Sequence, residues 1–197
     1  MNQETEFQAV LDLIVMMLLN WRTGSLILLL LAAAAIDIRS HRIPNWLVLA
    51  GMLFGVFLNV WLPYSRDTGW LWPLEGIAIG LGAFLPLYLI GAMGAGDVKL
   101  MATVGGFVGP AQMLPVLLYT MIAGGVLSIL YVLVKGTARR MAWNLLSLFH
   151  PGMPNAMQGA GPLRALAPAN SAGRMPYGSA IAAGTIAYIT AHQLGLT

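Results

Sequence analysis

Two aspartates in this chain, Asp37 and Asp97, have the residue type and the setting that acid–base chemistry requires. Asp37 lies in A-A-I-D-I-R-S-H-R-I-P-N and Asp97 in G-A-M-G-A-G-D-V-K-L, and each stands at the end of an apolar segment. Charging a carboxylate beside hydrocarbon is costly unless the group is paired, hydrated or protonated. An ionisable group in such a place is a functional candidate, and two of them at similar depth predict one shared site.

A pair of carboxyl groups can activate water for peptide hydrolysis. The ionised member acts as the general base, while the protonated member polarises the scissile carbonyl and later donates a proton. Two such groups lying close together do not ionise at the same time, so the pair holds one proton over a range of pH and titrates as a unit. Their distance along the sequence is no obstacle once the helices that carry them pack together.

Gly94 and Gly96 stand just before Asp97. Glycine gives the chain conformations that other residues avoid, and it lets an extended substrate backbone approach without obstruction by side chains. Asp97 then opens the next helix, where a carboxylate is favoured by free N–H groups and by the helix dipole. A purely structural capping role for Asp97 therefore stands beside the catalytic one.

The structural alternative for Asp37 is an interfacial ion pair with Arg39 or Arg42. Glu75 is a third acid near an apolar segment, but it lies at the opposite end of its helix and next to tryptophans. We interpret Glu75 as an interfacial anchor and do not assign it to catalysis.

Composition identifies an integral membrane protein. Of the 197 residues, 58% are hydrophobic and 9% are charged, and the mean hydropathy is +0.78; soluble domains carry about 25% charged residues. A soluble domain of this size has no core large enough to hide so much apolar surface.

The chain has no cysteine, and its three histidines are far apart. Disulfides, thiolate nucleophiles and zinc–thiolate sites are therefore excluded, and we expect neither a metal nor a cofactor. The slight excess of basic residues forms no stripe that would bind nucleic acid, and we interpret it as information on topology. Membrane lipid is an expected partner, and nucleic acid is not.

The hydropathy pattern predicts an all-α fold, a polytopic membrane helix bundle with about six transmembrane helices in a membrane domain covering 23–197. Most of the apolar segments approach the ~20 residues that a helix needs to cross the hydrocarbon. The predicted spans are 23–38, 43–62, 72–93, 98–113, 115–134 and 176–195.

Two regions stand apart from these spans. Residues 1–22 form an N-terminal interfacial or accessory segment, in which 7–21 is too short to span and contains Asp12. A signal peptide in the first 35 residues is the alternative, although the long acidic lead-in argues against it. Residues 135–175, rich in Pro, Gly, Asn and Ser, predict one loop that contacts lipid headgroups or substrate, or else simply connects two helices.

The basic residues predict which side each loop occupies. Alternating the spans leaves only Arg22 and Arg66 on one side. The other side is cytoplasmic by the positive-inside rule, and the same assignment puts Asp37 and Asp97 at the cytoplasmic ends of their helices. The residues on that side are Arg39, Arg42, Lys99, Lys135, Arg139, Arg140, Arg164 and Arg174.

Three stretches, in order, resemble the prepilin peptidases, intramembrane aspartyl proteases of the GxGD type. They are Asp37 followed by R-S-H-R-I-P-N, G-A-G-D at 94–97 followed by V-K-L, and R-M-P-Y-G-S-A-I-A-A-G at 174–184. The resemblance implies that Asp37 and Asp97 are the catalytic pair. It also implies that the enzyme removes the short basic leader from prepilin or pilin-like precursors near the cytoplasmic face of the bacterial inner membrane.

The resemblance extends to positions that would shape the site or position substrate: Gly94, Gly96, Lys99, Arg39, Pro44, Asn45, Arg174, Pro176, Tyr177 and Gly178. We expect Pro44 and Asn45 to set the start of the second helix and the basic residues to contact headgroups or carboxylates. The four residues of the last motif would shape the site from the last helix, with plain helix entry as the alternative.

The larger bifunctional members also methylate the new N-terminus and carry paired cysteines, which this chain lacks. The resemblance therefore implies cleavage without methylation, as in tight-adherence (Flp-type) pilus systems, for which residues 1–22 are longer than needed. Three alternatives stay open: an archaeal-type preflagellin peptidase, a small proton-coupled transporter using the same two aspartates, and an inactive assembly factor.

Overall fold

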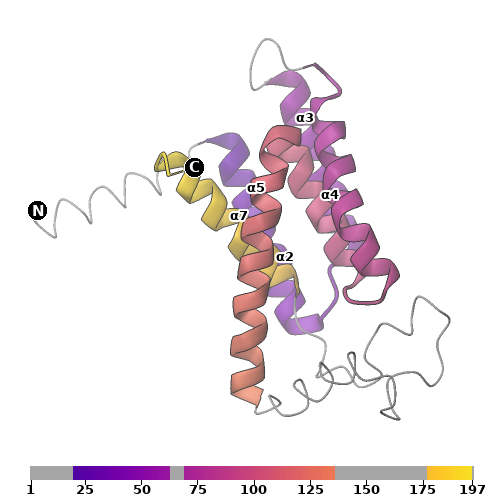
Figure 1. Ribbon diagram of the computed structural model, residues 1–197. Coiled ribbons are helices and arrows are strands. Elements are labelled where there is room, and N and C mark those ends of the chain that lie inside the picture. Colours follow the sequence, from indigo (N-terminus) through magenta and orange to yellow (C-terminus); the bar gives the residue numbers. More distant parts are fainter. Residues whose placement is uncertain (1–19, 63–68, 136–176, 197) are drawn as a thin grey trace, which may run out of the picture.

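A computed structural model describes residues 20–62, 69–135 and 177–196, which form helices and no strand (Figure 1). The helices are α2 (Trp21–Ser40), α3 (Asn45–Trp61), α4 (Trp72–Leu89), α5 (Ala95–Lys135) and α7 (Tyr177–Gln193). The all-α class is thereby confirmed for the described part of the chain. Most of the predicted N-terminal segment 1–22 and nearly all of the predicted 135–175 loop lie outside the described residues.

The predicted number of six membrane crossings is approximate. Among the described residues, three helices are long and apolar enough to span a membrane, namely Trp21–Ser40, Trp72–Leu89 and the 37-residue stretch Ala95–Tyr131. Asn45–Trp61 is a shorter apolar helix. The long stretch in α5 contains both the fourth and most of the fifth predicted span.

Helix α5 consists of two limbs that meet at Gly109. Gly109 has φ 75° and ψ 179°, a non-helical conformation inside α5, and Figure 1 shows the chain reversing there. A positive φ favours glycine, and a side chain here would collide with the Trp72 ring. Pro110 can then open the second helix because its missing N–H has no intrahelical partner to lose. The predicted boundary between 113 and 115 is therefore wrong, and Pro115 lies inside the second limb.

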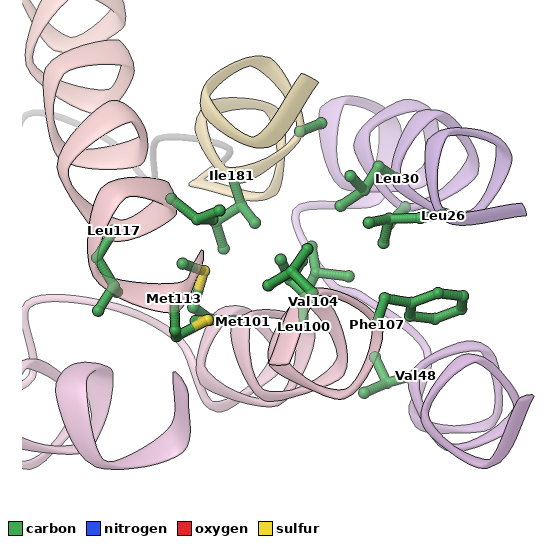
Figure 2. Packing of buried hydrophobic residues seen from close by; sticks show 14 of the residues in the cluster. Leu26, Leu30, Val48, Leu100, Met101, Val104, Phe107, Met113, Leu117 and Ile181 are labelled. Atoms are coloured by element: carbon green, nitrogen blue, oxygen red, sulfur yellow. The ribbon is translucent and has the colours of Figure 1, made fainter. Parts of the chain in front are cut away.

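The first limb of α5 (95–108) is the centre of the bundle. Leu100, Met101 and Val104 on this limb are fully buried. Figure 2 shows side chains from α2, α3, α7 and the second limb (110–135) converging on it. These surrounding residues are Leu26, Leu30, Val48, Ile181, Met113 and Leu117. A segment enclosed by other helices need not match the bilayer thickness, which explains why this limb is short.

Two polar side chains attach α3 to the first limb. The Thr103 hydroxyl donates a hydrogen bond to the Val48 carbonyl at 3.3 Å, and Asn59 Nδ2 donates to the Gly106 carbonyl at 2.8 Å. Such interhelical bonds hold helices together in lipid, where the hydrophobic effect offers little help. They fix the register of α3 against the segment that begins beside Asp97.

Small residues bring the backbones of α4 and α5 into direct contact. A Cβ placed on Gly76 would overlap the Gly105 carbonyl, and one placed on Gly105 would overlap the Gly76 carbonyl. Close glycine contacts of this kind are typical of helix pairs in membranes. They hold the first limb against α4 and so fix the position along the bundle of the first turn of α5, which carries Asp97.

We expect Gly105→Ala to destabilise the protein by about 1–3 kcal/mol, because the neighbour that must move is backbone rather than a flexible side chain. Gly82→Ala is the matched control, since a Cβ on this α4 glycine meets no atom within 4 Å. Thermal unfolding in detergent micelles measures both changes. If Gly105→Ala has the same melting temperature as Gly82→Ala, the close packing of α4 against α5 is contradicted.

One end of the bundle gathers the segments that carry the two aspartates. The last turn of α2 and the first turns of α3, α5 and α7 all lie at the end where the connection 41–44 turns back into the bundle (Figure 1). Residues far apart in the sequence are therefore neighbours there.

Candidate active site

Asp97 lies in the first turn of α5 and caps that helix. Its Oδ2 accepts a hydrogen bond from the Gly94 N–H at 3.0 Å, and its own N–H donates to the Gly94 carbonyl at 3.2 Å. The carboxylate bond back to the Gly94 N–H is one half of a capping box, and it satisfies an N–H group that has no intrahelical acceptor. The side chain is buried, with 9% of the residue exposed. The structural role considered from the sequence is therefore present, and within the part of the chain that the structure describes it uses Oδ2.

Asp37 lies in the last turn of α2 and is 5% exposed. Its Oδ2 accepts a hydrogen bond of 2.7 Å from the N–H of Gly178, in the first turn of α7. The bond recorded for this carboxylate thus goes to α7 rather than to Arg39 or Arg42. Helix α2 ends beside it because His41 adopts a left-handed conformation and donates its N–H to the Asp37 carbonyl at 2.8 Å.

The two aspartates are held in the same way. Each uses Oδ2 to accept a glycine N–H at the N-terminus of a helix, α5 for Asp97 and α7 for Asp37. Free N–H groups and the helix dipole favour a carboxylate in both places. The two carboxyl groups also interact electrostatically. Among the described residues the bonds to these carboxyl groups use Oδ2, and an arrangement of two neighbouring carboxyl groups can act on one water molecule and one peptide bond.

Gly178 leaves no room for a side chain. A Cβ on this residue would lie 2.8 Å from Asp37 Oδ2 and 3.1 Å from Ile43 Cδ1. A Cβ on Gly96 would lie 3.2 Å from Ile43 Cβ. The absence of side chains at these two glycines lets α7 and the start of α5 close around the connection between α2 and α3.

Sequence reasoning missed Ile43, which is 9% exposed and packs beside both aspartate-bearing segments. A signal for it was available, because Ile43 is the one apolar residue within the polar stretch R-S-H-R-I-P-N. An apolar side chain in a polar connection often folds back into the protein.

Lys99 and Asn45 form a contact at the edge of this region. The Lys99 ammonium donates a hydrogen bond of 3.0 Å to Asn45 Oδ1, and both residues are exposed. Asn45 is the first residue of α3 and directly follows Pro44, its N-cap. This bond joins the start of α5 to the start of α3, and the predicted contact of Lys99 with a headgroup or a carboxylate stays a prediction.

Because this bond is exposed, we expect it to contribute little stability. In a double-mutant cycle with Lys99→Met and Asn45→Ala, the coupling energy should be about 0.5–1 kcal/mol. Thermal unfolding of the four proteins in micelles measures it. A coupling several times larger would show that the pair anchors α3 rather than merely touching it.

The remaining predicted residues lie in different surroundings. Tyr177 is half-buried, and its ring lies near Gly124 on the second limb of α5. Arg39 is exposed on the last turn of α2. Glu75 is exposed in the first turn of α4, away from the aspartates. Arg174 and Pro176 lie outside the described residues.

Within the described ranges, no group of three or more His, Cys, Asp or Glu side chains comes together in a way that could hold a metal ion. The described site brings together two carboxyl groups, the glycine N–H groups that hold them and the apolar side chain of Ile43, and His41 interacts electrostatically with Asp37.

Comparison with known proteins identifies the family to which this chain belongs. The chain matches the model of the type IV leader peptidase family over residues 24–129, more than half of its length and a region that contains both aspartates. It is 33% identical over 120 residues to a prepilin leader peptidase/N-methyltransferase of Myxococcus xanthus (strain DK1622), a match that covers 57% of this chain and 35% of that protein. The chain thus spans about a third of the length of this curated relative, and no solved structure matches it. The matched region contains the first two of the three motifs, those of Asp37 and Asp97, and the motif at 174–184 lies beyond it. The family match confirms the resemblance, and the protein belongs to the type IV leader peptidase family.

Proposed function

We propose that this protein is an intramembrane aspartic endopeptidase in which Asp37 and Asp97 are the catalytic pair. The observation that carries the proposal is the matched placement of two buried carboxyl groups, each held through Oδ2 by a glycine N–H at a helix N-terminus. Buried acids in a membrane bundle are costly, and structural capping alone requires only one oxygen of each. The interaction between the two groups supports a shared role.

In the proposed reaction, one carboxyl group is ionised and takes a proton from water, which attacks the carbonyl carbon of the scissile peptide bond. The protonated partner hydrogen-bonds to the carbonyl oxygen, and a proton passes to the leaving amide nitrogen as the C–N bond breaks. The products are a new carboxyl terminus on the leader and a new amino terminus on the mature protein. The chain's own residues supply both the base and the acid.

The proposed substrate is a pilin-like precursor with a short basic leader and an apolar helix, in keeping with the name of the Myxococcus xanthus relative, a prepilin leader peptidase/N-methyltransferase. The apolar helix would lie against the bundle, and the leader would unwind beside Gly94 and Gly96. Exposing a backbone carbonyl is tolerable at a hydrated boundary but not in the middle of a bilayer. Basic leader residues would be attracted to anionic headgroups and would orient the chain before cleavage.

The same proposal assigns the aspartate end to the cytoplasmic face of the inner membrane. Arg39, Arg42 and Lys99 are exposed at that end, and the positive-inside rule favours the cytoplasm for it. Because the printed sequence has no cysteine, whereas the bifunctional members carry paired cysteines, we assign cleavage without methylation to this chain.

The test is co-expression of the protein with Flp-type precursors, followed by mass spectrometry of the precursor's N-terminus. The proposal predicts a shortened product with a free, unmethylated amino terminus. If several precursors stay intact while the protein is abundant in the membrane, the peptidase proposal is rejected and the transporter alternative becomes the better one. A methylated product would reject only the cleavage-without-methylation part.

A further inference from the structure

Ile43 touches the two backbone segments that hold the aspartates. Its Cδ1 lies 3.1 Å from the place a Cβ on Gly178 would occupy, and its Cβ lies 3.2 Å from the corresponding place on Gly96. Gly178 supplies the N–H that holds Asp37, and Gly96 directly precedes Asp97 in α5. One side chain thus packs between the start of α7 and the start of α5.

The connection that carries Ile43 is constrained on both sides. His41 adopts φ 50° and ψ 31° at the end of α2, and Pro44 adopts φ −65° and ψ 134° at the start of α3. A residue that precedes proline is restricted to extended backbone conformations. Isoleucine is branched at Cβ, which restricts χ1 as well. Because both its backbone and its side chain are restricted, Ile43 can hold the start of α7 and the start of α5 at a fixed separation.

We propose that Ile43 is a positioning residue that sets the separation between the Asp37 and Asp97 carboxyl groups. The inference rests on the proposed function, because it assigns catalysis to those two residues. Ile43 has no proton to exchange and does not react. It acts through the glycine backbones, and a change of about 1 Å in the positions of catalytic groups costs about a hundredfold in rate.

The side chain can be shortened in two steps, of which the first removes the contact with Gly178 and the second also removes Cγ1, 3.7 Å from the place a Cβ on Gly96 would occupy. Ile43→Val removes Cδ1, the atom against Gly178, and keeps Cβ against Gly96. Ile43→Ala also removes the γ carbons. We expect kcat for precursor cleavage to fall about fivefold in the first variant and about fiftyfold in the second, with KM nearly unchanged, since the substitutions change the positions of the acids rather than substrate binding.

Ile27 provides the matched control. It is 8% exposed, close to the 9% of Ile43, and it lies in the opposite half of α2, away from the aspartates. Ile27→Val and Ile27→Ala remove the same atoms from a similarly buried site. We expect these variants to lower the melting temperature as much as the Ile43 variants do while keeping kcat. Equal loss of kcat at both positions would reduce Ile43 to an ordinary core residue and overturn the proposal.

A second measurement needs no activity. Because the chain has no cysteine, Asp37→Cys/Asp97→Cys introduces two unique thiols at the positions in question. Bifunctional thiol reagents of increasing span then report their separation. We expect Ile43→Ala to shift the best-yielding reagent to a shorter span and Ile27→Ala to leave it unchanged.

An unchanged span in Ile43→Ala would refute the positioning role even if catalysis were lost. Conversely, if the wild type cleaves no precursor but the span shifts as expected, the proposed function fails and the spacing role of Ile43 stands. The two failures are therefore distinguishable.

Discussion

Replacing Asp37 or Asp97 by asparagine should reduce precursor cleavage by at least about a thousandfold, the scale seen when one member of a catalytic unit is removed. The fold should survive, because the asparagine side-chain oxygen can still accept the N–H of Gly178 or Gly94 that the carboxylate accepts now. What is lost is the ability to take up and release a proton. A gel-shift assay of the precursor, normalised to the amount of protein in the membrane, measures the effect.

Glu75→Gln is the control for this pair of variants. Glu75 is an exposed acid in the first turn of α4, away from the aspartate end, and the same change of charge there should leave cleavage within about twofold of the wild type. An Asp37→Asn or Asp97→Asn protein that still cleaves at such a rate would assign that aspartate a capping role only.

Adding a single methyl group at Gly178 should have the next largest effect. A Cβ there would lie 2.8 Å from Asp37 Oδ2 and 3.2 Å from Asp37 Cβ, so the carboxylate must leave the position in which it accepts the Gly178 N–H. We expect Gly178→Ala to lower kcat about a hundredfold, since catalysis depends strongly on the placement of the reacting groups. Cleavage under saturating precursor measures this change.

The matched control for this substitution is Gly125→Ala, since a Cβ on that α5 glycine meets no atom within 4 Å. The two proteins should reach similar abundance, and only Gly178→Ala should lose activity. If Gly178→Ala cleaves as fast as Gly125→Ala, the bond between α7 and Asp37 has no part in catalysis, whatever the role of Asp37 itself.

The helices and the location of the site were predictable from the sequence. In a chain with 9% charged residues, the few charged and polar positions mark where each apolar span ends. Helices α2, α3 and α7 begin and end within about two residues of the predicted spans. The pattern of basic residues placed Asp37 and Asp97 at one end of the bundle, and in the structure the two carboxyl groups interact.

The partners of the two carboxylates were not predictable in the same way. The capping bond of Asp97 is local, and its N-terminal position and the preceding glycines indicated it. Asp37 is bound by an N–H that lies 141 residues away in the sequence, and no local pattern specifies that contact. For Ile43 the sequence offered a sign of burial, an isoleucine within a polar stretch. It did not show what the side chain contacts, because both contacts form only after three segments have packed together.

The path of α5 was misjudged because hydropathy divided it between 113 and 115. The second limb continues through this point and holds Pro115 within a helix. The break occurs at Gly109, where a positive φ and the Trp72 ring together require a residue without a side chain. A hydropathy pattern contains no information about backbone φ or about contact with a distant ring, so it did not predict this break.

Single-turnover cleavage by the wild type, Asp37→Asn, Asp97→Asn and the double variant shows whether the two aspartates act as one catalytic unit. If the two acids share one reaction, removing either already removes the activity. We therefore expect both single variants and the double variant to have the same residual rate. A double variant whose loss of rate is the product of two separate, smaller losses would show instead that Asp37 and Asp97 act independently.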